Sequence, residues 1–174
     1  INKGFVLAVK GGTNAENHNH NDVGQFIICI NEKPLVIDLG SGEYKRNTFT
    51  DDRYSLFFTR GESHNIPVIN GFEQYSRNTA RAENVKVSEN KNGETITMDI
   101  QSAYPQEAEI IKCSRVCSFE RTDKPKIQVT DSFNMRKYPA IVELNLFSPF
   151  GISKKNKVIN FVNGRHKINA IING

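Results

Sequence analysis

Three of the four histidines in the chain fall between Gly11 and Gln74, in turns rich in polar residues and glycine. The densest group is the run Asn17-His18-Asn19-His20-Asn21-Asp22. If this run is extended, His18, His20 and Asp22 point to one side and the asparagines to the other. Two imidazoles on one face form either a metal-binding pair or a metal ligand beside an acid–base group. They equally suit a polar edge whose histidines only satisfy hydrogen bonds.

A carboxylate and a third histidine follow this run. Asp38 lies at the end of the apolar run Leu35–Leu39, where an isolated acid is costly to bury unless it is paired or bound to a cation. A turn aspartate is a common alternative there. His64 stands just before Ile66-Pro67, which predicts an extended entry into the next strand. Two imidazoles and one carboxylate with an open fourth position suit Zn²⁺, so the residue types favour a zinc site.

Composition describes the elements that must position these side chains. The 174 residues, which suit one domain, include 18 Ile and 12 Val against 6 Leu and 8 Ala. β-Branched residues lose rotamer freedom in helices and fit pleated surfaces, so this excess predicts a sheet protein. Twenty Asn and 12 Gly supply turn residues between strands. No apolar stretch reaches 18 residues, so we expect no membrane-spanning segment.

Short apolar runs separated by turn signals predict the strands themselves. Asn92-Gly93 and Asn163-Gly164 are strong hairpin signals because both residues tolerate positive φ. The fold class we predict is all-β, an antiparallel β-sandwich of the jelly-roll or supersandwich type. The expected strands lie within residues 5–9, 26–30, 35–39, 85–87, 96–100, 116–119, 127–133, 141–147 and 158–162. The first three are compact apolar runs of the kind buried on both faces.

Charge and cysteine content narrow the functional classes only slightly. The net charge of +4 is a mild excess, and its densest cluster, Lys154, Lys155 and Lys157, is typical of a solvated turn. No run interleaves basic and aromatic residues, so we expect no nucleic-acid partner, whereas an acidic polysaccharide fits the charge. Cys113 and Cys117 would lie about 13 Å apart in a strand, too far to bridge. With Cys29, they are expected to be small buried hydrophobic residues.

Together, these motifs resemble the heparinase II/III-like polysaccharide lyases, including their alginate lyase relatives. The resemblance is close over residues 8–75 and rests on several spaced motifs in the right order. The matching residues are Gly11-Gly12, His18-Asn19-His20-Asn21-Asp22, Gly24, Phe26, Pro34-Leu35, Asp38, Gly40, Tyr44, Arg53-Tyr54, Ser63-His64-Asn65, Pro67, Asn70-Gly71 and Gln74.

The resemblance implies an enzyme that joins an N-terminal α/α toroid to antiparallel β-sheet domains. This chain looks like the β region alone, a single domain over residues 1–174 with its motifs in 8–75 and scaffold strands in 76–174. A start at Ile1 rather than Met fits a fragment of a longer protein. Because the main catalytic Tyr and another His and Asn of such enzymes come from the toroid, we expect the isolated fragment to be inactive. A periplasmic or secreted location is implied, with any targeting signal upstream.

Residue roles follow from the same resemblance. The family's metal ligands correspond to His20, Asp38 and His64, with one Zn²⁺, and His18 corresponds to a residue of the catalytic cleft. The implied reaction is β-elimination at a uronic acid in a heparan-sulfate-like or alginate-like polymer, for which imidazole is a suitable acid–base group. Arg53 and Tyr44 are the candidate substrate-binding residues. A structural salt bridge suits Arg53 equally well, and interface packing suits Tyr44.

Two alternatives stay open at the level of sequence. A non-catalytic carbohydrate-binding or structural module could retain the same metal site. A metal-dependent hydrolase also uses a His-x-His pair with an aspartate, although no carboxylate is obviously placed to bridge a second metal.

Overall fold

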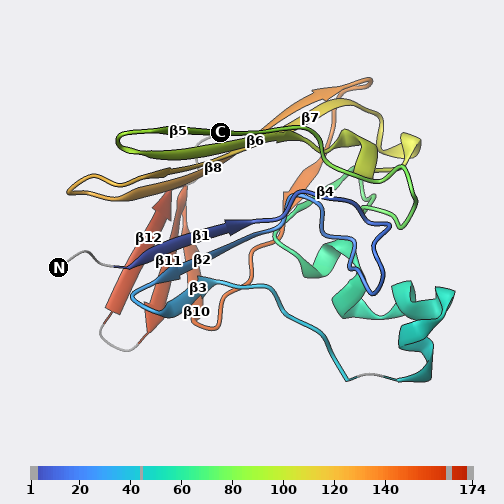
Figure 1. Ribbon diagram of the computed structural model, residues 1–174, viewed down its shortest axis with the longest axis horizontal. Coiled ribbons are helices and arrows are strands. Elements are labelled where there is room, and N and C mark those ends of the chain that lie inside the picture. The colour runs from blue at the N-terminus through green and yellow to red at the C-terminus, as the bar shows by residue number, and fades with distance from the viewer. Residues whose placement is uncertain (1–3, 44, 164–165, 172–174) are drawn as a thin grey trace.

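The computed structural model describes residues 4–43, 45–163 and 166–171, and within them the chain is built from antiparallel β-strands, turns and short 3₁₀ helices. Two of the sheets lie face to face, one above the other (Figure 1). The predicted all-β, sandwich-like fold class is therefore confirmed.

The lower layer is a three-stranded meander. Its order is β1-β2-β3, with β1 at Phe5–Val9, β2 at Phe26–Ile30 and β3 at Lys33–Val36. The third strand was expected to run to Leu39 but ends three residues earlier, at Val36. The expected burial of β1 on both faces is wrong, because its residues alternate in exposure and Val6 is 55% exposed. This sheet therefore packs on one face, as antiparallel sheets commonly do.

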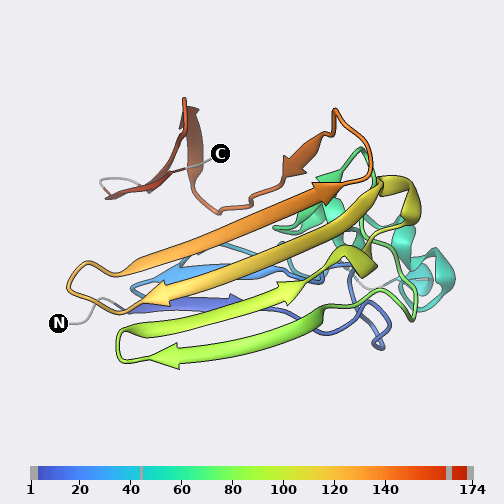
Figure 2. The same cartoon turned by 90° about the horizontal axis from the view of Figure 1, so that it is seen from above.

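A longer four-stranded sheet covers this layer (Figure 2). Asn92-Gly93 forms the predicted hairpin between its first two strands. At Gly93, φ is +156° and an added Cβ would lie 1.8 Å from the Phe119 carbonyl oxygen, so only glycine fits. The strands, in sheet order, are β5 (Glu83–Asn90), β6 (Gly93–Asp99), β7 (Ile110–Glu120) and β8 (Lys126–Met135).

Two smaller sheets complete the fold. A two-stranded sheet pairs β4 (Pro67–Ile69) with β9 (Val142–Leu144), the only part of the expected 141–147 strand that forms. A separate meander pairs β10 (Gly151–Lys155), β11 (Val158–Asn163) and β12 (His166–Ile171). The predicted turn at Asn163-Gly164 falls partly outside the described residues, since Gly164 is not among them.

Short 3₁₀ helices connect the strands, most of them in the segment between β3 and β4. None of the helices in the described part of the chain is long and apolar enough to cross a membrane. The helices are η1 (Arg46–Phe49), η2 (Asp51–Ser55), η3 (Phe57–Thr59), η4 (Gly61–Ser63), η5 (Gln101–Ala103) and η6 (Gln106–Ala108).

Two buried clusters hold the layers together. The first joins Met98 of β6 and Cys113 of β7 to Val23, which lies just before β2. The second joins Phe26 and Val36 of the lower sheet to Phe161 of β11. Because Val9 packs against both clusters, the two cores meet at the end of β1.

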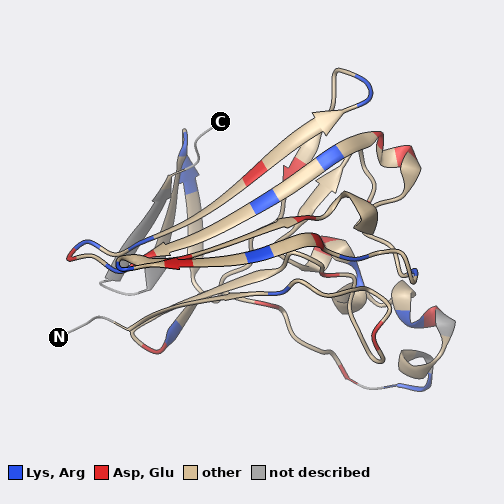
Figure 3. Cartoon of the chain, turned by 45° about the horizontal axis from the view of Figure 1, so that its top comes forward, with Lys and Arg blue, Asp and Glu red and all other residues tan. Residues whose placement is uncertain are grey.

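Positions of both charge signs occur along the upper strands and near the hairpin turns (Figure 3). In this view the basic positions do not form one continuous stretch, so they do not by themselves mark a binding surface.

Two of the three cysteines are sealed in the core, which leads to a first prediction. Cys113 and Cys117 are 0% and 1% exposed, and burial raises the pKa of their thiols to about 12 and about 11. Because the thiolate is the reactive form, we expect an aqueous disulfide reagent to modify at most Cys29, which is half-buried, in the native protein. All three should react after unfolding in guanidinium. Modification of two or three thiols at similar rates in the native protein would contradict this burial.

Candidate metal centre

The histidine-rich run lies in a long loop that is closed at its base. Lys10 N–H donates to the Gln25 carbonyl and Gly24 N–H donates to the Lys10 carbonyl, both at 2.8 Å, so the two ends of the loop meet where β1 and β2 begin to pair. A further tie is the ion pair between Lys10 Nζ and Asp22 Oδ1, at 2.5 Å. These contacts fix the loop on the end of the lower sheet.

The run inside this loop is not an extended strand, so the condition under which histidines and asparagines would alternate is not met. His18 has φ +58° in the left-handed region and turns the chain. Asn19 is buried next to it, with its side-chain amide donating to the Asn14 carbonyl at 2.6 Å and the His20 carbonyl at 3.0 Å. His18 is exposed and its ring lies against Phe49, whereas His20 is half-buried and its ring lies near that of His64.

Sheet topology brings Asp38 to this loop. Because β2 and β3 are antiparallel, with Ile28 opposite Val36, the residues that precede β2 lie beside those that follow β3. Asp38 comes two residues after the end of β3, at the same end of the lower sheet as the closed loop. The carboxylate thus lies close to the histidine-rich run although they are distant along the chain.

Asn65 places the third residue, His64, at this end of the lower sheet. Its side-chain amide donates to the carbonyls of Phe26 and Ile37, both at 2.9 Å, and so bridges the start of β2 and the segment after β3. Its oxygen accepts from Phe147 N–H, also at 2.9 Å. A buried amide with all these hydrogen bonds fixes the backbone next to it, and His64 is the preceding residue.

His20, Asp38 and His64 form one cluster, as the sequence predicted. One nitrogen or oxygen atom from each lies within 4.8 Å of those of the other two. His64 Nδ1 and Asp38 Oδ2 are 2.8 Å apart, and the rings of His20 and His64 have centroids 5.2 Å apart. His64 is fully buried, and its Nε2 has no hydrogen-bond partner among the residues that the structure describes. An unpaired buried ring nitrogen is costly, and a donor set of two imidazoles and one carboxylate fits a divalent metal.

A glutamine that the sequence analysis missed orients this cluster. Gln25 donates from Nε2 to Asp38 Oδ2 at 3.0 Å and accepts the Asn65 N–H at 2.6 Å, so it ties the carboxylate to the chain beside His64. Gly40 N–H donates to the other carboxylate oxygen, Oδ1, at 2.6 Å. The only sequence signal was a polar residue directly before an apolar strand, which is too common to single out Gln25.

Burial and neighbouring groups hold Asp38 and His20 in protonation states that favour a cation. Burial alone would raise the pKa of Asp38, but hydrogen bonds from His64, Gly40 and Gln25 hold it at about 2. Burial, with a smaller contribution from nearby His64, lowers the pKa of His20 below its usual 6.5. At neutral pH, Asp38 is therefore ionised and His20 neutral, which are the forms that bind metals.

Of the other predicted site residues, His18 lies in the closed loop and Arg53 contacts it. The His18 ring lies edge-on to Phe49, with centroids 5.5 Å apart. Arg53 Nη2 donates to the Asn19 carbonyl at 2.7 Å, between the two histidines, and Tyr54 Oη donates to Asn19 Oδ1 at 2.8 Å. Arg53 thus binds a backbone carbonyl of the loop. Tyr44 lies outside the described residues.

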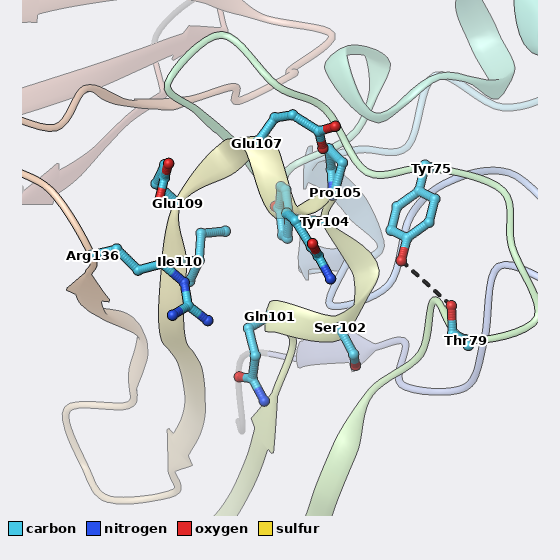
Figure 4. Close-up of a pocket in the computed structure, with 11 residues that line it drawn as sticks. Tyr75, Thr79, Gln101, Ser102, Tyr104, Pro105, Glu107, Glu109, Ile110 and Arg136 are labelled. Atoms are coloured by element: carbon cyan, nitrogen blue, oxygen red, sulfur yellow. Dashed lines mark hydrogen bonds between the residues drawn. The ribbon is translucent and has the colours of Figure 1, made fainter.

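A hollow of about 720 Å³ lies away from this cluster, beside η5 and η6 (Figure 4). Tyr75, Gln101 and Arg136 border it, with Tyr75 Oη 3.4 Å from Thr79 Oγ1. It contains no histidine and none of the predicted site residues. The candidate site is therefore identified by the convergence of metal-binding atoms, and this hollow does not mark it.

The comparison with known families agrees with this geometry. A family model described as heparinase II/III-like, C-terminal, matches residues 2–157. The chain belongs to this family. The match extends well beyond the motif-rich region and takes in β1 to β10 of this heparinase II/III-like domain. A search of curated proteins gave no match. Membership supports a polysaccharide lyase domain that works within a larger enzyme on an acidic polysaccharide.

Proposed function

We propose that this domain is the metal-bearing β-sheet domain of a lyase that cleaves a uronic-acid-containing polysaccharide by β-elimination. The observation that carries the proposal is the convergence of His20, Asp38 and His64 at one end of the lower sheet, in a chain of the heparinase II/III-like family. The metal we assign is Zn²⁺, held by these three residues. When bound, the ion would supply a fixed positive charge and tie together segments that are distant in sequence.

The reaction breaks the C5–H bond and the C4–O4 bond of the uronate and forms a C4=C5 double bond. A base must take the C5 proton, and the leaving O4 must receive a proton. We assign one of these proton transfers to His18, which is exposed and lies two residues from His20. Its position in the closed loop lets the contacts that fix His20 also fix His18, because a catalytic side chain needs a rigid support.

Neutralisation of the uronate carboxylate makes the C5 proton acidic. We assign Arg53 to this task, because its guanidinium is positive and is held beside the His18–His20 segment through the Asn19 carbonyl. Its Nε is buried without a hydrogen-bond partner among the described residues. Tyr44 is the second residue that we assign to substrate binding, from the family resemblance alone.

The deciding test is the product that the full-length protein makes from uronate polymers. Incubation with heparan sulfate and with alginate should produce a rise in ultraviolet absorbance, because the C4=C5 bond is conjugated with the carboxylate. A neutral glucan serves as the control polymer. New reducing ends without absorbance would show hydrolysis, and binding without cleavage of any polymer would show a carbohydrate-binding module. Either result would overturn the lyase proposal.

A further inference from the structure

Arg115 has the largest fully buried side chain among the described residues, and it lies far along the chain from the metal cluster. Arg115 lies in the middle of β7, in the upper sheet, and its side chain is 1% exposed. Its partner Asp131 lies opposite it on β8 and is 6% exposed. Buried ion pairs of this kind are weak evidence for stability, because their attraction must offset a large desolvation cost. The burial of this pair is therefore better explained by the other groups that Arg115 binds.

The guanidinium of Arg115 joins the upper sheet to two segments of the metal cluster, namely the closed loop that carries His20 and the segment that carries His64. Nε and Nη2 donate to the two carboxylate oxygens of Asp131, each at 2.7 Å. Nη1 donates to the Gly24 carbonyl at 2.7 Å and to the Asn65 carbonyl at 2.8 Å. One nitrogen thus links a residue of the closed loop with the residue that follows His64.

Each of these carbonyls belongs to a residue next to a group that holds the cluster. Gly24 precedes Gln25, whose amide binds Asp38, and Asn65 follows His64 directly. Gln25 also accepts the Asn65 N–H, so the hydrogen bonds form a closed circuit through Arg115. The guanidinium carbon also lies 5.4 Å from the centroid of the Phe26 ring, a cation–π contact that adds to the hydrogen bonds of Arg115.

The backbone at Gly24 is shaped for this contact. Gly24 has φ +90°, and an added Cβ would lie 3.5 Å from Ile100 and 3.8 Å from Arg115 Cδ. These distances are ordinary van der Waals contacts, so space alone would allow a side chain, but the positive φ would strain it. Glycine therefore lets the backbone adopt the conformation in which its carbonyl accepts the Arg115 hydrogen bond.

We propose that the Arg115–Asp131 pair is a positioning device for the metal centre, which holds the His20 loop and the His64 segment at the separation that a metal ion requires. This inference rests on the proposed metal site. The planar fork of arginine suits the task, because it binds the carboxylate with one edge and two carbonyls with another nitrogen. Lysine offers a single nitrogen and cannot reproduce that geometry.

The test compares zinc affinity with fold stability in three variants of the purified protein. Arg115→Lys keeps the charge but loses the fork, and Arg115→Met/Asp131→Leu removes both charges without leaving one unpaired. Met135→Ala is the control, because Met135 lies in the first buried cluster and its truncation leaves every Arg115 hydrogen bond in place. We expect zinc to bind about 10–100-fold more weakly to both Arg115 variants than to the unaltered protein. Met135→Ala should lose a similar amount of melting temperature but keep the zinc affinity of the unaltered protein.

The outcomes separate this inference from the proposed metal site. No zinc binding by the unaltered protein would overturn both. Zinc binding by the unaltered protein, with equal affinity in the Arg115 variants, would overturn only the positioning role. If the double variant fails to fold, Arg115→Lys decides, together with amide hydrogen exchange at Asn65 in the metal-free protein. We expect faster exchange there in Arg115→Lys than in Met135→Ala, and equal rates would contradict the proposal.

Discussion

Addition of Zn²⁺ to the metal-free protein is expected to raise its melting temperature by roughly 8–16 °C when free zinc exceeds the dissociation constant about 1,000-fold. The reason is linkage: a ligand that binds only the folded state stabilises it by about 4 kcal/mol at that excess. For a chain of this length, each kcal/mol moves the melting temperature by about 2–4 °C. The measurement is calorimetry with and without zinc, and a chelator should reverse the shift.

Removal of one ligand should abolish this zinc-dependent shift. We expect His20→Ala and Asp38→Asn to unfold at the same temperature with and without zinc. The difference between the two scans is the measured quantity, since each substitution also changes the metal-free protein. Asn17→Ala, in the same loop but exposed, is the matched control and should keep the full shift. A full shift in both ligand variants would show that zinc binds elsewhere.

The second large effect concerns His18 and turnover. His18→Ala in the full-length protein is expected to lower the rate of ultraviolet-absorbing product formation by about 10²–10⁴-fold, the usual contribution of a positioned acid–base group. His18 is exposed and its ring lies edge-on to Phe49, so its truncation should leave the fold intact. Initial rates on the preferred polymer provide the measurement.

His18 and His20 should therefore have separable effects. His18→Ala should lose turnover while keeping zinc affinity and the zinc-dependent rise in melting temperature. His20→Ala should lose both zinc binding and turnover. Glu16→Ala, an exposed change in the same loop, controls for general disturbance of the loop. Normal turnover in His18→Ala would remove this residue from the chemistry and leave proton transfer to other groups.

The metal cluster could be predicted from sequence because its signals are local. His20, Asp38 and His64 each lie in a short motif of polar residues, and the family resemblance ordered those motifs along the chain. The strands were predictable for a similar reason, since β-branched residues and Asn-Gly turns act over a few residues. The 3₁₀ helices between β3 and β4 were not predicted, because turns of three to five residues leave no periodic pattern.

The support around the cluster could not be predicted from sequence. Gln25 precedes an apolar strand and Arg115 lies between serine and valine in an alternating one, where the sequence pattern is typical of ordinary strand residues. Their roles depend on contacts between segments 40 to 91 residues apart, such as Asn65 with Gln25 and Arg115 with Gly24. The bent path at His18 likewise depends on the buried Asn19, which binds Asn14 of the same loop and Tyr54 of a segment 35 residues away.

The closed circuit through Arg115 has a consequence for the order in which the protein matures during synthesis. All three residues of the cluster are synthesised by residue 64, whereas Arg115, Asp131 and the core residue Phe161 follow later. Contacts between such distant segments form slowly, because the intervening chain must first be ordered. The nascent N-terminal half therefore displays histidines and a carboxylate without the frame that sets their spacing. If the cluster binds zinc as proposed, we therefore expect the metal to bind late, after the upper sheet has formed.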